Sequence, residues 1–76
     1  MSGHFAARLV VAITPDDVGE RVSLRRRLVT GEYSDVVGML ESWSGGTLQV
    51  RRRDGELVEV PESIVVAGKV VPKQPP

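Results

Sequence analysis

The sequence predicts an all-β fold, a small five-stranded barrel with a short 3₁₀ turn before its last strand. Two observations lead to this prediction. From Glu20 onward, apolar and polar residues alternate over several short stretches, which is the pattern of half-buried β-strands. Turn signals such as 44-SGG-46 and Asp54-Gly55 separate these stretches. Closing such a sheet into a barrel also removes most of its exposed edges.

Composition sets the limits of this fold. The chain has 76 residues, which allows one domain at most, near the lower end of what a single core can stabilise. It has no cysteine, so it lacks a disulfide framework and a thiolate metal site, as expected in the reducing cytosol. Ten Lys and Arg residues balance ten Asp and Glu residues, so the basic excess usual for nucleic-acid binders is missing. The positive charge is concentrated in two triples, Arg25–Arg27 and Arg51–Arg53.

Residues 1–17 form an N-terminal arm whose structure the sequence leaves open. Its segment 5-FAARLVVAI-13 fits a strand, a short helix or a leader without fixed structure, and we expect an apolar arm packed against the domain. The run 9-LVVAI-13 is too short to cross a bilayer, and Asp16 and Asp17 follow too closely for a secretory signal. We therefore expect a cytoplasmic protein with no membrane partner.

The next segment, 14-TPDDVGERV-22, carries turn residues and allows two structures. One is an irregular turn built on Pro15, the two aspartates and Gly19. The other is a short helical turn with Thr14 as its N-cap and Pro15 at its first position. The barrel itself is expected to occupy residues 18–72.

The first strand is expected at 21-RVSLRRRLV-29, because Val22, Leu24 and Leu28 alternate with polar residues and define an inward face. Arg26 interrupts that face, and an unpaired buried charge is very costly. We therefore expect Arg26 to lie near a rim of the barrel or to pair with an acid.

A polar loop, 30-TGEYSD-35, leads to the second strand at 36-VVGMLESW-43, which is rich in β-forming residues. Gly38 lies inside this strand. A glycine there predicts a β-bulge, a sharp bend or the close approach of another backbone.

The third and fourth strands form the hairpin 48-LQVRRRDGELVEV-60, whose loop length sets the register. A two-residue loop would pair apolar with polar residues. A three-residue loop, Arg53 to Gly55 with Gly55 left-handed in a G1 bulge, places all apolar pairs on one face and points Arg51 away from the core. We predict this second register, which pairs Leu48 with Val60, Val50 with Val58, and Arg52 with Glu56 as an ion pair beside the turn.

The end of the chain completes the barrel. The stretch 61-PESI-64 fits a short 3₁₀ turn, and 65-VVAGKVV-71 is the last strand. Residues 73–76 read as a Pro-rich tail or the start of a linker. Five short strands with tight turns and a 3₁₀ turn before the fifth describe an SH3-like barrel.

Few residues suit catalysis or metal binding. The single histidine, His4, lies in the arm without a base or ligand partner, so the serines lack a histidine to activate them. Asp16, Asp17 and Glu20 form no recognisable calcium loop. We expect no catalytic residue, no metal site and no cofactor, so the chain is not expected to be an enzyme.

The arginine triples allow two interpretations. On a strand, Arg25 and Arg27 point to one side and Arg26 to the other, so a triple is not a continuous patch. If the first and third strands flank the second, Arg25 or Arg27 shares an outer face with Arg51. Together with Arg53 they form a candidate nucleic-acid-binding surface that would contact phosphates. Acids are spread among these arginines, and we favour a solvated face.

The aromatic residues suggest the competing surface. Tyr33 lies in the expected loop and Trp43 beside the 44–46 turn, positions that can bring both to the same end of the barrel. With Arg51 and Arg53 they make the candidate partner-binding surface. Trp43 also fits a plug of the core or an anchor between domains.

Two runs of residues resemble a known family. They are 18-VGERVSLRRRL-28 and 35-DVVGMLESWSGGTLQVRRRDGELVEVPESIVVAGKVVP-72. The runs are similar to the SH3-like domain at the N-terminus of a group of actinobacterial GNAT-family (histone acetyltransferase-like) N-acetyltransferases, over residues 18–72. A weaker resemblance is to the small C-terminal barrel of biotin ligases.

The resemblance implies a non-catalytic accessory module, attached to or associated with a GNAT-type acetyltransferase, that works by docking to a domain or partner protein. In that family a catalytic domain follows the small domain after a Pro-rich stretch, which 72-PKQPP-76 would begin. The acetyl-CoA pyrophosphate loop of GNAT enzymes, R/Q-x-x-G-x-G/A leading into a helix, is absent from this sequence. Nucleic acid is the alternative partner.

Overall fold

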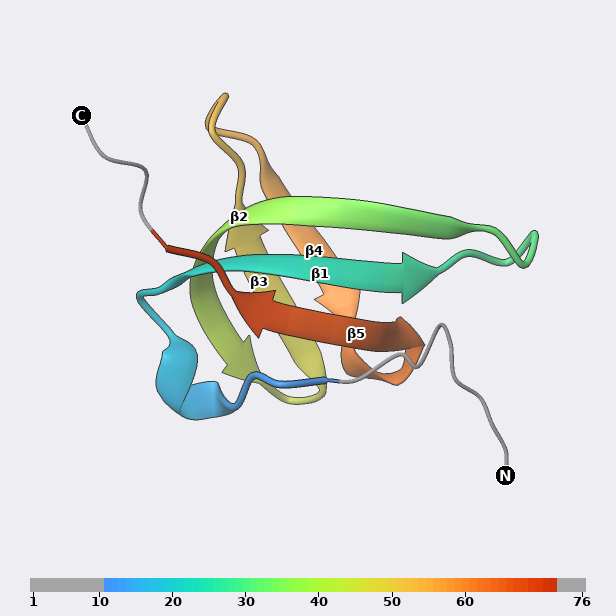
Figure 1. The fold of residues 1–76 in the computed structure, drawn as a ribbon, viewed down its shortest axis with the longest axis horizontal. Coiled ribbons are helices and arrows are strands. Elements are labelled where there is room, and N and C mark those ends of the chain that lie inside the picture. Colours follow the sequence, from blue (N-terminus) through green and yellow to red (C-terminus); the bar gives the residue numbers. More distant parts are fainter. Residues whose placement is uncertain (1–10, 73–76) are drawn as a thin grey trace.

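The computed structural model describes residues 11–72 and shows a five-stranded antiparallel sheet that curls into a small barrel (Figure 1). The strand order is β4-β3-β2-β1-β5. Its elements are η1 Pro15–Asp17, β1 Arg21–Arg27, β2 Tyr33–Ser44, β3 Thr47–Arg51, β4 Leu57–Pro61, η2 Glu62–Ile64 and β5 Val65–Val70. The expected all-β fold, with a 3₁₀ turn before its last strand, is confirmed. Within the described range no helix is long and apolar enough to span a membrane.

The core consists of the inward residues of the alternating strands together with Ile13, which precedes η1. In β1, Val22 and Leu24 are buried while Arg25 and Arg27 are exposed, as the period-two pattern predicts. Each buried Val or Leu contributes about 1.5–3 kcal/mol to folding. The buried apolar residues are Ile13, Val22, Leu24, Val36, Leu40, Leu48, Val50 and Val60.

The segment before β1 forms the short helical turn, the second of the two expected structures. Thr14 is the N-cap: its Oγ1 accepts a hydrogen bond from the Asp16 N–H (3.2 Å), and its own N–H donates to Asp17 Oδ2 (2.9 Å). Ile13 is buried, and Val11 forms a bridge to β5 at Gly68. The packed part of the chain therefore begins before residue 18. The rest of the expected arm (residues 1–10, with His4) and the expected tail at 73–76 lie outside the described residues.

β2 begins at Tyr33, whereas the sequence predicted a loop over residues 30–35. The loop between β1 and β2 is therefore shorter than expected. The reason is the pairing with β1, in which Tyr33 lies opposite Arg27 and Asp35 opposite Arg25. Gly38 confirms the close approach of another backbone, because a Cβ on it would overlap the Arg51 carbonyl group of β3. The β-bulge or irregularity of the β2–β3 ladder does not lie at Gly38 but between Leu40 and Ser42.

The β3–β4 hairpin has the predicted three-residue register. Leu48 lies opposite Val60 and Val50 opposite Val58. The Arg52 N–H donates to the Glu56 carbonyl oxygen (2.8 Å), and Gly55 is left-handed with φ 94°.

The expected Arg52–Glu56 ion pair is wrong. Among residues 11–72 the ion pairs are Arg25–Asp35 and Arg51–Glu41. Arg52 continues the inward series of β3, and its Nε is buried without a hydrogen-bond partner, whereas Glu56 is exposed. The two side chains therefore form no ion pair, although the two backbones are hydrogen-bonded.

Arg26 lies near a rim of the barrel, which is the first of the two positions expected for it. It is half-buried one residue before the end of β1, and its Nε has no hydrogen-bond partner. No carboxylate of the described range forms an ion pair with it.

Candidate docking surface

Arg25, one of the arginines predicted to contact a partner or nucleic acid, forms a salt bridge on the outer face of β1, β2 and β3. β2 lies between β1 and β3, which is the strand order needed for Arg25 and Arg51 to share an outer face. Arg25 donates from Nε to Asp35 Oδ1 (2.8 Å) and from Nη2 to Asp35 Oδ2 (3.1 Å). These hydrogen bonds lower the pKa of Asp35 and raise that of Arg25. The guanidinium is already engaged in the bidentate geometry that would bind a phosphate.

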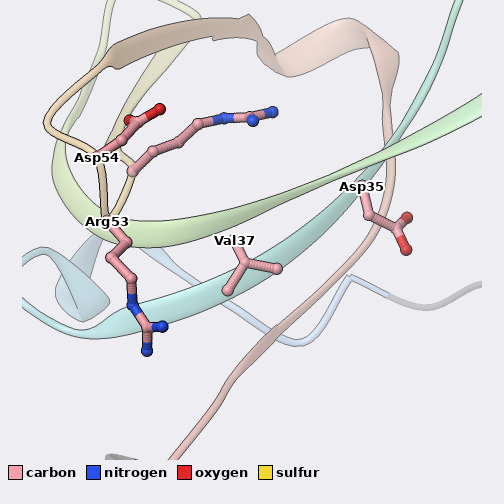
Figure 2. Close-up of a pocket in the computed structure, with 5 residues that line it drawn as sticks. Asp35, Val37, Arg53 and Asp54 are labelled. Atoms are coloured by element: carbon pink, nitrogen blue, oxygen red, sulfur yellow. The ribbon is translucent and has the colours of Figure 1, made fainter.

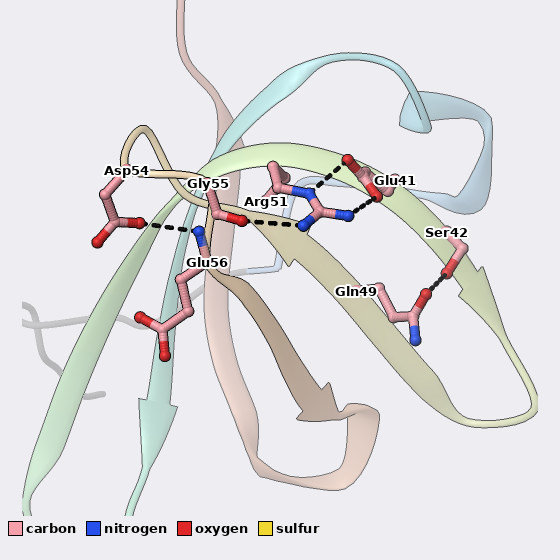
Figure 3. A network of polar contacts seen from close by, with 7 residues as sticks. All are labelled: Glu41, Ser42, Gln49, Arg51, Asp54, Gly55 and Glu56. Carbon is pink, nitrogen blue, oxygen red and sulfur yellow. Dashed lines mark hydrogen bonds and ion pairs between the residues drawn. The ribbon is translucent and has the colours of Figure 1, made fainter.

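Arg51 is held in the same way from β3 (Figure 3). It donates from Nε and Nη2 to the two carboxylate oxygens of Glu41 (2.9 and 3.2 Å), which lowers the pKa of Glu41 by hydrogen bonding. Its Nη1 also donates to the Gly55 carbonyl oxygen at 2.9 Å. Arg51 therefore ties the tip of the hairpin to the bulged part of β2.

The other two expected arginines are exposed. Arg27 ends β1 and Arg53 lies in the hairpin turn, and neither forms an ion pair within the described range. Two of the four candidate phosphate contacts, Arg25 and Arg51, thus have their charge matched by a neighbouring acid.

The two aromatic residues do not share one end of the barrel. Tyr33 begins β2 and is half exposed, whereas Trp43 lies near the other end of this 12-residue strand. Trp43 packs against the core, and its Nε1 donates to Glu62 Oε1 (2.9 Å). The structure therefore places Trp43 as a plug of the core, and the length of β2 separates it from Tyr33.

Exposed apolar residues occupy the middle of the outer face, between the two ion pairs. Val37 and Met39 are about two-fifths exposed on β2. Met39 lies opposite Arg51, and Arg51 lies opposite Leu57, which is also exposed. Sequence reasoning missed these residues, although Val37 and Met39 occupy the outward positions of an alternating strand, where polar residues are usual.

An open pocket of ≈ 410 Å³ lies between the hairpin tip and β2 (Figure 2). In the figure Arg53 and Asp54 stand on the hairpin side, and Val37 and Asp35 on β2. Its lining residues are Asp35, Val37, Arg52, Arg53 and Asp54. Of the predicted site residues only Arg53 lines it; Arg52 was assigned to an ion pair that is not formed.

A second open pocket, of ≈ 400 Å³, lies at the end of β1 and is lined by Arg27, Leu28, Val29, Ser63, Ile64 and Val66. Across residues 11–72, no group of three or more His, Cys, Asp or Glu side chains is placed to hold a metal ion.

Comparison with protein families identifies this barrel. The family model of the Rv0428c N-terminal Sm-like domain matches residues 15–69, which include η1, the first four strands and all but the last residue of β5. Comparison with curated proteins gives no significant match, and comparison with solved structures gives none either. The chain belongs to the family of the Rv0428c N-terminal Sm-like domain, a small β-barrel.

Proposed function

We propose that this barrel is a non-catalytic docking module of, or associated with, a GNAT-type acetyltransferase. The description of its family refers to a domain at the N-terminus of a protein, which fits a module that accompanies another domain. The association with an acetyltransferase is proposed from the sequence resemblance to the N-terminal domain of actinobacterial GNAT enzymes. The absence of cysteine fits a module that works in the cytoplasm.

The observation that carries the docking function is the outer face of β2. Val37 and Met39 are exposed there, while Arg25 and Arg51 on either side are paired with acids. An apolar centre with a satisfied polar rim is the usual anatomy of a protein–protein interface. Matched charges at the rim also cost less to cover than unpaired ones.

Titration calorimetry tests this function. The 76-residue chain is titrated with the catalytic domain of a GNAT enzyme that carries a domain of this family. We expect binding, and we expect Met39→Glu to abolish it because a charge would be buried in the apolar centre. The matched control is Val29→Glu, at a fully exposed valine in the β1–β2 turn. If the wild-type chain does not bind, or if both variants bind equally well, the proposal is wrong.

Nucleic-acid binding is the second candidate, favoured by one observation. Arg27 and Arg53 are exposed and have no ion pair in the part of the chain that the structure describes. Their test is an amide-shift titration with short DNA and RNA oligomers at low and moderate salt. Salt-sensitive shifts that Arg53→Glu and Arg27→Glu both weaken would favour this function over docking.

A further inference from the structure

The first half of β2 has a hydrogen-bonded neighbour on only one side. Along its β1 side, residues 33–39 pair with residues 21–27 without interruption. On its β3 side the pairing stops at Met39 opposite Arg51. Within residues 11–72 no strand therefore lies beside Tyr33 to Val37 on that side.

The hydrogen-bond alternation shows which groups face this free side. At one end of the ladder the Leu40 N–H donates to the Glu20 carbonyl oxygen (2.9 Å), and at the other the Leu28 N–H donates to the Glu32 carbonyl oxygen (2.8 Å). Even-numbered residues of β2 therefore bond to β1. In an antiparallel ladder the residues between them direct their N–H and C=O groups the opposite way. Those of Asp35 and Val37 thus point away from β1.

The hairpin tip turns away before it can pair with these groups. A continued ladder would bring Arg53 opposite Val37, but Arg52 already bonds across the hairpin to Glu56 (2.8 Å), so Arg53 lies in the turn. The open pocket of ≈ 410 Å³ lies in the resulting space (Figure 2). The space begins next to Gly38, where the Arg51 carbonyl group lies tightly against β2.

The charges around this space favour an acidic occupant. Arg52 and Arg53 line it and have no ion pair within the described residues. Of the two lining carboxylates, Asp35 is taken by Arg25, and Asp54 accepts a hydrogen bond from the Glu56 N–H (2.9 Å). Two guanidinium groups and the Asp54 carboxylate therefore remain without an ion pair within residues 11–72, which leaves an excess of positive charge around the space.

We propose that the free edge of β2 at Asp35–Val37, together with the hairpin tip at Arg52–Arg53, binds an extended acidic peptide segment as an added β-strand. Backbone pairing with the edge would supply affinity, and the two arginines would select acidic side chains. The edge from residue 33 to residue 37 is about 13 Å long between its first and last Cα atoms, so it accommodates about five residues of peptide. This inference does not depend on the acetyltransferase and specifies a mode of recognition that the docking proposal leaves open.

Amide exchange in the isolated chain gives the first test. The Val37 amide, on the free side, should exchange faster than the Val36 amide, which faces β1. A blocked six-residue peptide of alternating glutamate and valine is then added at low salt. It should slow exchange at Asp35 and Val37 and shift the Arg52 and Arg53 amides. The same peptide with lysine in place of glutamate should bind more weakly.

Two pairs of variants separate the edge from the charge. Val37→Pro removes the outward N–H without removing a bond to β1, and it should weaken binding about three- to tenfold relative to Val37→Thr. Arg53→Glu, in the exposed turn, should also weaken binding. Its control is Lys69→Glu, at an exposed lysine of β5 outside the space, which makes the same change of charge and should leave binding unchanged.

Several results would overturn the proposal. They are equal binding of the two peptides, equal binding by Val37→Pro and Val37→Thr, or shifts on another face. Concentration-dependent shifts without peptide would instead indicate pairing with a second copy of the chain, and stronger binding of single-stranded DNA at the same residues would indicate a nucleic acid. Failure here leaves calorimetry with the catalytic domain and Met39→Glu unaffected, so the two proposals can fail separately.

Discussion

Gly38 of β2 lies against the backbone of Arg51 of β3, so tightly that a Cβ on residue 38 would overlap the Arg51 carbonyl oxygen. This contact lies where the β2–β3 ladder ends, one residue from the pairing of Met39 with Arg51. It lets the hairpin leave the sheet at this point while its base stays packed against β2.

Gly38→Ala should therefore destabilise the barrel. The added methyl group meets backbone atoms that cannot rotate away, so one strand must shift, and overpacking of this kind costs about 1–3 kcal/mol. Urea unfolding measures the change. Ser44→Ala, at an exposed position of the same strand, is the control and should change stability little. Equal stability of the two variants would show that the contact relaxes freely.

The parts of this fold that sequence predicted are those governed by neighbouring residues. The apolar alternation on both sides of Asp54-Gly55 fixed the hairpin register, and a left-handed Gly55 followed from the loop length. The N-cap at Thr14 and the close approach at Gly38 were each one of the alternatives that the sequence left open, and the structure selects them.

The candidate site was harder to predict because it depends on how strands pair across the sheet. The expected loop ended at Asp35, so the pairing that brings Asp35 to Arg25 could not be foreseen. The separation of Tyr33 from Trp43 follows from the full length of β2. The free edge exists only because β3 pairing stops at Arg51, a property of the folded sheet.

The two outer ion pairs predict a loss of stability in acid. Hydrogen bonds from Arg51 and Arg25 hold the pKa values of Glu41 and Asp35 below their ordinary range. A carboxyl group with a lowered folded-state pKa stabilises the fold above its unfolded pKa and loses that contribution as the pH falls through the folded value. Urea unfolding between about pH 6 and about pH 3 should therefore show falling stability.

The double variant Asp35→Asn, Glu41→Gln should lose less stability over the same range, because it lacks both titrating groups. Both pairs are exposed, so the difference should be small and should shrink further at high salt. Glu32→Gln, outside both ion pairs, is the control and should keep the wild-type slope. Parallel curves for the wild type and the double variant would contradict this prediction.

Truncation of a single buried leucine should greatly reduce the stability of the fold. Leu40 is fully buried, so Leu40→Ala removes buried methyl groups and leaves a cavity, at a cost of about 2–5 kcal/mol. A domain of this size has little stability to lose, and the variant should be largely unfolded by circular dichroism. Leu57→Ala, on the outer face, is the matched control and should cost much less. A folded Leu40→Ala with wild-type thermal stability would mean that the core repacks around the gap.

Trp43 and Tyr33 should differ in how much each contributes to the stability of the fold. Trp43 packs on the core and donates to Glu62, so Trp43→Ala should cost about 2–4 kcal/mol of stability, whereas the half-exposed Tyr33→Ala should cost less than about 1 kcal/mol. Thermal unfolding of both variants measures the difference. Trp43→Phe keeps an aromatic ring but loses the N–H, and should lie between the wild type and Trp43→Ala. If Trp43→Ala is as stable as the wild type yet no longer docks to the acetyltransferase domain, Trp43 is a binding residue and its assignment as a core plug is wrong.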